Sequence, residues 1–130
     1  MFKTSALALG FALTAGLAAA QETAPQQDPD MAVSAAQNQL GVLEYCVAEG
    51  HIDGAAVETQ NELITMMPAA TDQDAVDAAY AKGQEGTVSA MGVEQTLADA
   101  AAAQGSDEAA LCAQLASLVE QAGEQVSQQQ

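Results

Sequence analysis

The chain has 130 residues and a formal charge of −16, because 18 acidic residues face only two cations. Nucleic acids and anionic membranes attract proteins through Lys and Arg, so both repel such a surface. The composition therefore excludes a nucleic-acid-binding protein. It also predicts membrane contact only at low pH, where carboxylates with an ordinary pKa of about 4 lose their charge.

The first 20 residues have the layout of a secretory signal peptide. A short cationic start at Met1–Lys3 precedes an uncharged apolar run at Ser5–Leu17 and three small residues at Ala18–Ala20. We expect cleavage between Ala20 and Gln21, which makes the mature chain periplasmic or secreted. The alternative is a retained membrane anchor, but a spanning helix needs about 20 apolar residues and this run is shorter.

Cleavage leaves a small, strongly acidic chain. Lys82 becomes its only cation, and the formal charge changes to −17. The remaining 110 residues suit one domain with a single core. We predict a flexible leader over residues 21–30, a helical domain over residues 31–124 and a disordered, glutamine-rich tail over residues 125–130.

The chain contains two cysteines, Cys46 and Cys112. An exported protein folds in an oxidising compartment, so a structural disulfide is the expected state of this pair. The bridge would close a loop of 67 residues, counting both cysteines. Closing a loop of this length stabilises the fold by about 4 kcal/mol in the chain-entropy model. The alternative is a redox-active pair, which lacks a Cys-x-x-Cys motif and a neighbouring cation in the sequence.

Apolar residues recur at helical spacing, and no segment alternates with period 2 for long. We therefore predict an all-α fold, a small bundle of four to five short helices joined by one disulfide. The first helix starts at an Asp30 N-cap and stops at Gly50, where glycine allows a left-handed end. Three more helices are predicted from an Asp53 N-cap to Met67, from Thr71 or Asp72 to Gly83, and from Val93 to Gln104 with a stop at Gly105. The last helix is predicted to start at a Ser106 N-cap.

The same spacing predicts how some residues pack. In the last helix we expect one inward-facing stripe, formed by Leu111, Leu115, Leu118 and Ala122. Gly41 interrupts the first helix, which indicates close packing there. Among the later glycines, we expect close contact at Gly92 and plain bends at Gly83 and Gly86.

No residue pattern indicates catalysis. Glu49, His51 and Asp53 alternate around a corner, which is a weak metal pattern compared with an exposed corner capped by Asp53. The run that starts at Asp72 resembles a calcium loop but lacks its glycine and its final glutamate. No serine has the setting of an activated nucleophile. We therefore assign no catalytic, cofactor-binding or metal residues and expect a non-enzyme without cofactors.

Four segments carry a family resemblance, namely Leu40–Cys46, Gly50–Gly54, Met66–Ala70 and Gly86–Leu97. They resemble a group of small exported bacterial proteins labelled as pore-forming relatives of the early secretory antigenic target family. The similarity covers about residues 35 to 120. It implies export and membrane or pore-forming activity, and it assigns no functional residues. The Trp-x-Gly turn of the broader family is absent, because the sequence has no tryptophan.

Three functions follow as hypotheses. The first is an interaction module of the cell envelope, whose apolar helix faces bind an unknown envelope protein or a second copy. The second is the pore-forming activity that the resemblance implies. The alternative is an acid-responsive periplasmic chaperone, which small exported helical proteins with one disulfide can resemble.

Overall fold

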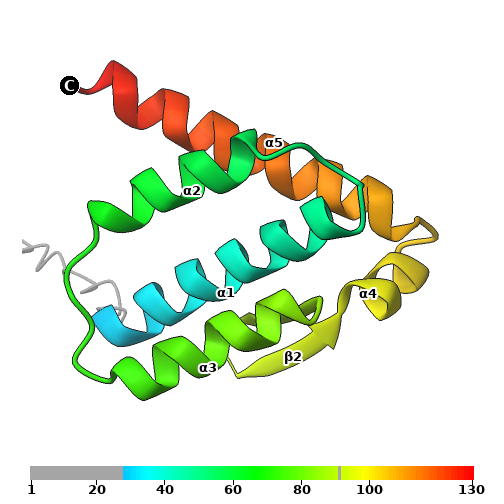
Figure 1. The fold of residues 1–130 in the computed structure, drawn as a ribbon, viewed down its shortest axis with the longest axis horizontal. Coiled ribbons are helices and arrows are strands. Elements are labelled where there is room, and N and C mark those ends of the chain that lie inside the picture. The colour runs from blue at the N-terminus through cyan, green and yellow to red at the C-terminus, as the bar shows by residue number, and fades with distance from the viewer. Residues whose placement is uncertain (1–27, 91) are drawn as a thin grey trace, which may run out of the picture.

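The computed structural model describes residues 28–90 and 92–130, so the predicted signal peptide, its cleavage site at Ala20 and Gln21, and most of the leader lie outside the described residues. Within this part, the chain forms five helices and one antiparallel hairpin (Figure 1). The elements are α1 (Pro29–Ala48), α2 (Ala55–Thr65), α3 (Gln73–Gln84), β1 (Thr87–Ala90), β2 (Val93–Thr96), α4 (Leu97–Ala103) and α5 (Glu108–Gln128). The predicted small helical bundle is confirmed.

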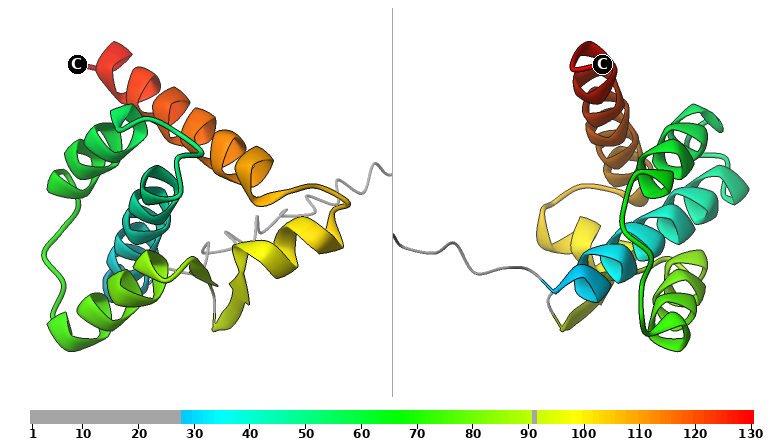
Figure 2. Two further views of the ribbon diagram at one scale, coloured as in Figure 1. Left: turned by 45° about the vertical axis from the view of Figure 1, so that its right-hand side comes forward. Right: turned by 90° about the vertical axis from the view of Figure 1, so that its left-hand side faces the viewer.

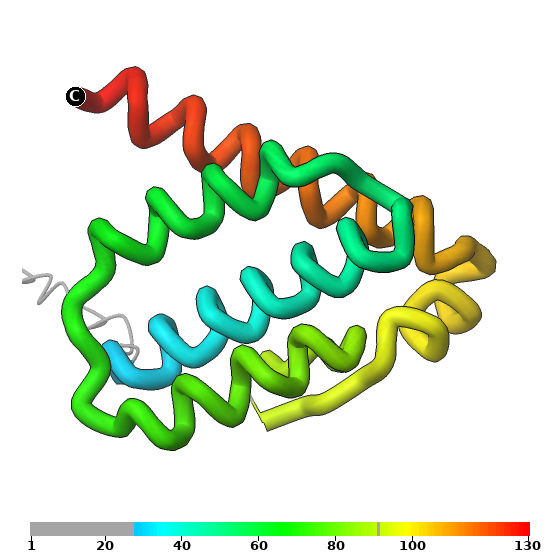
Figure 3. Tube along the Cα trace, viewed as in Figure 1, coloured from blue at the N-terminus to red at the C-terminus, as the bar shows by residue number. Residues whose placement is uncertain are grey.

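Helix α1 is the central element of the fold. Helices α2 and α3 flank it on two sides, and α3 runs parallel to α1 (Figure 1). The trace in Figure 3 shows how the chain turns back along α2, forward along α3 and out through the hairpin to α4. Helix α5 then returns against α1 and α2, and its C-terminal end extends away from the bundle (Figure 2).

Carboxylates cap three of the helices. Asp72 Oδ1 accepts a hydrogen bond from Ala75 N at 3.1 Å, so of the two predicted starts of α3, Thr71 and Asp72, the second is the N-cap. Two other predicted caps are wrong. The N-cap of α1 is Asp28 instead of Asp30, because Pro29 fits the first helical position. The N-cap of α5 is Asp107 instead of Ser106. A carboxylate caps a helix as well as a hydroxyl does, and Asp107 is one residue closer to the helix.

Two predicted glycine stops are confirmed. Gly50 has φ 76°, and the next residue donates from His51 N to Cys46 O, the long bond of a Schellman motif. Gly105 has φ 65° and ends α4 with the same pattern, in which Ser106 N donates to Ala101 O. Local chemistry therefore fixes both corners next to the disulfide-bearing helices.

The predicted helix over residues 93–104 is wrong in its first turn. Residues Val93–Thr96 form strand β2, which pairs with β1 in the register Val88 to Gln95. The connection between the strands ends at Gly92, whose φ of 78° suits a tight hairpin turn. The β-branched residues of this segment, Thr87, Val88, Val93 and Thr96, favour strands, but each run is too short to show clear alternation.

Helices α1 and α3 approach most closely at two glycines. A Cβ atom built on Gly41 would lie 2.3 Å from Tyr80 O, and one on Gly83 would lie 2.2 Å from Asn38 O. The predicted close packing at Gly41 is confirmed. The predicted roles of Gly83 and Gly92 are reversed, since Gly83 is buried inside α3 and Gly92 faces open space.

The predicted disordered tail is also wrong for most of its length, because α5 continues to Gln128. Val126 is half-buried, and Ser127 Oγ donates to Gly123 O at 3.0 Å within the helix. One apolar side chain that still packs, together with unbroken intrahelical bonds, is enough to extend the helix beyond residue 124.

Candidate interaction groove

The disulfide positions α5 against the C-terminal half of α1. Cys46 and Cys112 are bonded, with an S–S distance of 2.01 Å and a Cα–Cα distance of 5.7 Å, so the predicted pairing is confirmed. Both residues are fully buried. They pack with Val42 and Leu97 in a core cluster that joins α1, α4 and α5.

The face that α5 turns toward the core differs from the predicted one. Its buried residues are Cys112, Ala116 and Val119. Leu115 is only half-buried, and the predicted core residue Leu118 is 55% exposed. The helix is rotated because the disulfide fixes the face of Cys112 toward α1, and residues four and seven positions later share that face. As a result, Leu115 packs only at the edge of the core, and Leu118 points to solvent.

Leu115 also lines a groove of about 270 Å³ between α1, β1 and α5, which we call the α1 groove. Its floor is one face of α1, since the floor residues follow helical spacing. The lining residues are Ala35, Asn38, Gln39 and Val42 from α1, Val88, Ser89 and Ala90 from β1, and Leu115 from α5. None of these residues carries a charge, although the chain as a whole has a formal charge of −16.

Asn38 holds the β1 wall of the groove in place. Its Nδ2 donates to Ala79 O and to Thr87 O, both at 2.9 Å, and its Oδ1 accepts from Ser89 N at 2.8 Å. The side chain is 2% exposed, so these bonds satisfy a polar group that would otherwise be costly to bury. The side-chain amide forms hydrogen bonds with the backbone of β1 along the edge that is not paired with β2, as a neighbouring strand would. Sequence analysis missed this residue, because its partners lie 41 to 51 positions away.

The α1 groove continues toward the N-terminal end of α1 into a second, acidic pocket. This pocket has a volume of about 330 Å³ and shares Ala35 and Ser89 with the groove. Three carboxylates line it, those of Asp28, Asp30 and Asp72. Asp28 and Asp72 are fixed by capping bonds to backbone N–H groups of α1 and α3.

Asp30 connects α1 to the loop before α3. Its Oδ1 accepts from Thr71 N at 2.7 Å, and its Oδ2 accepts from the Thr71 hydroxyl. The hydrogen bond from the Thr71 hydroxyl, followed by the one from the Thr71 backbone, lowers the pKa of this carboxyl below its ordinary value. Asp30 therefore stays ionised at neutral pH, and the acidic pocket keeps its negative charge.

A polar cluster closes the opposite side of α1, where α3 packs. Tyr80 donates from its hydroxyl to Glu44 Oε2 at 2.5 Å, and Gln84 Nε2 donates to the same oxygen at 2.8 Å. The hydrogen bond to the Glu44 carboxylate, assisted by burial, raises the pKa of Tyr80 to about 12. This side of α1 is filled by side chains of the protein itself.

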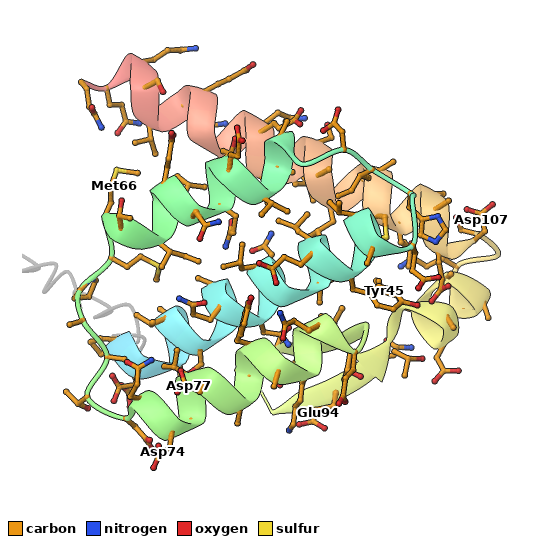
Figure 4. The ribbon with its side chains drawn as sticks, viewed as in Figure 1. Tyr45, Met66, Asp74, Asp77, Glu94 and Asp107 are labelled. Atoms are coloured by element: carbon orange, nitrogen blue, oxygen red, sulfur yellow. A yellow bond between two sulfur atoms is a disulfide. The ribbon has the colours of Figure 1, made fainter. Side chains whose placement is uncertain are left out.

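Tyr45 lies in the last turn of α1, near α4 (Figure 4), and its hydroxyl is 3.4 Å from Glu108 Oε1 at the start of α5. Its ring contacts Gly86, where a Cβ atom would lie 2.9 Å from the ring carbon Cζ. Gly86 therefore has a positive φ of 78°, as a bend allows, and also lies in close contact with the Tyr45 ring. The predicted plain bend describes only the first of these two features. Burial, more than the nearby Glu108, raises the pKa of the Tyr45 hydroxyl.

The weak metal and calcium patterns do not form sites within residues 28–90 and 92–130. No group of three or more His, Cys, Asp or Glu side chains in this part could hold a metal ion. Asp53 Oδ1 accepts from Ala55 N at 3.0 Å, but the N-cap of α2 is Gly54, so Asp53 lies one residue before the capping position predicted for it. His51 has a buried Nε2 atom with no hydrogen-bond partner in the described part of the chain. Asp74 and Asp77 are exposed on α3, and Asp74 points away from the fold (Figure 4).

None of the described helices combines the length and the apolarity that crossing a membrane requires. In comparisons with known proteins, no family model, no curated protein and no solved structure matches this chain.

Proposed function

We propose that this chain is a non-enzymatic, exported interaction protein of the cell envelope, and that it binds apolar side chains of a partner protein in the α1 groove. The observation that carries the proposal is the groove itself. It is uncharged and mostly apolar, on a molecule whose surface is otherwise strongly acidic. Partly exposed apolar surface bordered by polar residues is a common property of protein-binding sites.

The scaffold around the groove suits binding. Asn38 fixes the β1 wall through three hydrogen bonds, and the disulfide fixes the α5 wall. Because both walls are held in advance, a partner loses less free energy in ordering the site when it binds. At the same time, Leu115 leaves apolar surface in the groove, and Leu118 is exposed elsewhere on α5.

A photo-crosslinking amino acid introduced at Gln39 tests this proposal in cells. Gln39 lies in the groove floor, so the variant should crosslink to a partner in the envelope. The matched control replaces Asn61, an exposed residue of α2 that does not line the groove. A crosslinked partner seen at Gln39 and not at Asn61 supports the proposal. Equal crosslinking at both positions, or none at Gln39, contradicts it.

Two other functions would use other properties of the chain. Pore formation is implied only by the family resemblance, and it predicts release of a dye from liposomes. An acid-responsive chaperone predicts that aggregation of a client protein is suppressed below about pH 4 and not at pH 7, since carboxylates lose their charge there. No observation on the described residues favours either function as specifically as the α1 groove favours an interaction protein.

A further inference from the structure

We propose that the partner segment carries apolar side chains followed, at one end, by lysine or arginine, and that this basic end lies over the N-terminal end of α1. This inference rests on the proposed function, since it names the chemistry of the segment that the α1 groove binds. It follows from the size of the groove, from the acidic pocket that continues it and from the charge of the whole chain.

The size of the groove favours side chains of a protein segment over a free small molecule. Its volume of about 270 Å³ lies below the range of about 300–1,000 Å³ that is usual for small-molecule pockets. Its floor runs from Ala35 to Val42, which is about 10 Å along a helix at 1.5 Å per residue. This length matches about two helical turns of a partner, with a few apolar side chains pointing into the groove.

The acidic pocket fixes the direction of the segment. It adjoins the groove at Ala35 and Ser89, at the N-terminal end of α1. Its three carboxylates already accept hydrogen bonds from the backbone, and an ionised carboxylate has about four lone-pair sites, so each can accept a further bond from a lysine or arginine. A basic end placed here would pair with charges that Asp28, Asp30 and Asp72 hold in fixed positions.

The charge of the chain disfavours a second copy as the occupant. Each mature copy carries 18 acidic residues against Lys82. Helix α5 as a whole carries Glu108, Glu120 and Glu124 and no cation, so a second α5 bound at the groove would add negative charge beside the acidic pocket at neutral pH. A basic segment has the opposite sign, and it is attracted by the same field.

Binding of three synthetic peptides to the oxidised mature protein tests this inference at pH 7. The first peptide has leucines over two helical turns followed by two lysines, the second has glutamines in place of the lysines, and the third has glutamates. We expect fluorescence anisotropy to rank the lysine peptide first, by about threefold to tenfold over the glutamine peptide at low salt, as for two exposed ion pairs. Added salt should reduce this ratio.

Two double variants locate the effect. Asp28→Asn with Asp72→Asn removes two charges from the acidic pocket and keeps the caps, because Asn caps a helix as well as Asp. The control is Glu120→Gln with Glu124→Gln, which removes the same charge from a different surface between α2 and α5. The first variant should bring the lysine peptide to the affinity of the glutamine peptide, and the second should leave most of the difference. Equal effects of the two variants would overturn the assigned site.

The outcomes separate this inference from the proposed function. Equal affinity for all three peptides, with loss of binding in Ala35→Phe, would keep the α1 groove as the binding site and overturn the basic end. If no peptide binds but Gln39 still crosslinks to a partner, the α1 groove also remains the binding site and the basic end is overturned. Failure of the Gln39 crosslink and of every peptide would overturn both. A dimer in sedimentation at pH 7 that Ala35→Phe disrupts would assign the groove to a second copy and overturn this inference.

Discussion

Helix α1 meets α3 and α5 in opposite ways. Toward α3, the backbones meet at Gly41 and Gly83, and the Tyr80 cluster closes the edge. Toward α5, the helices are joined by the Cys46–Cys112 disulfide, and leucine side chains of α5 remain partly exposed beside the joint. The α3 side is closed where Gly41 meets Gly83 and opens at the start of α3, into the acidic pocket, whereas the α5 side leaves the α1 groove. Covalent attachment thus holds a helix in place without using all of its apolar surface.

The largest expected effect is on the α5 side. Replacing both cysteines by alanine should lower the free energy of unfolding by about 2–5 kcal/mol, the usual loss for a small secreted domain. Urea unfolding of the oxidised protein and of the double variant measures this difference. The oxidised protein should also show no free thiol in denaturant without reductant. Two reactive thiols under those conditions would contradict the role given to the disulfide.

The α3 side is tested by Gly83→Ala. The added methyl group would meet Asn38 O and Val42 N, both backbone atoms that cannot move aside, so we expect a loss of about 1–3 kcal/mol or more from overpacking. Gly54→Ala is the matched control, because no atom lies within 4 Å of its Cβ position and its φ is −82°. Thermal or urea unfolding should show little change in the control. Similar losses at both positions would mean that the close contact is not what limits residue 83.

Asn38 connects the α3 side to the α1 groove, because its side-chain amide forms hydrogen bonds with both α3 and the β1 wall of the groove. Asn38→Leu keeps a similar volume and leaves Thr87 O and Ser89 N without their partner, so we expect a loss of about 1–3 kcal/mol. Hydrogen exchange should become faster at Ser89 N, and peptide binding in the groove should weaken as the β1 wall loosens. Unchanged exchange at Ser89 would show that the hairpin does not depend on this amide.

The smallest effect concerns the Asp30–Thr71 contact. The folded pKa of Asp30 is lowered, so its contribution to stability is present above the unfolded pKa of about 4 and is lost as pH falls through the folded value. Asp30→Asn should therefore be slightly less stable than the wild-type protein at pH 7, and the difference should disappear in strong acid. Melting temperatures of both proteins across this range measure the effect. A difference that persists in strong acid would mean that the carboxylate charge is not responsible.

The sequence was most informative where the chemistry is local. The stops at Gly50 and Gly105 depend on residues within one turn and were predicted correctly, and the start of α3 was predicted to within one residue, as Thr71 or Asp72. The disulfide was also predictable, since only one pairing of two cysteines exists within the chain. These features determine where helices begin and end, but not which of their faces point inward.

The remaining features depend on tertiary packing. The rotation of α5 follows from the constraint at Cys112, so the predicted stripe through Leu118 was wrong although its spacing was helical. The role of Asn38 requires partners more than 40 residues away, and Gly83 differs from Gly92 only in what lies next to it. The α1 groove could therefore not be found in the sequence, because it consists of surface that three separate elements leave uncovered.

Amide chemical-shift mapping by NMR compares the two sides of α1 in one measurement. Titrating the oxidised mature protein with the leucine–lysine peptide should shift the signals of Ala35, Gln39, Val88 and Leu115, which line the α1 groove. The signals of the closed α3 contact, from Tyr80 to Gln84, should stay in place. Shifts centred on the α3 contact, or on the exposed Met66 at the end of α2, would contradict the α1 groove as the binding site.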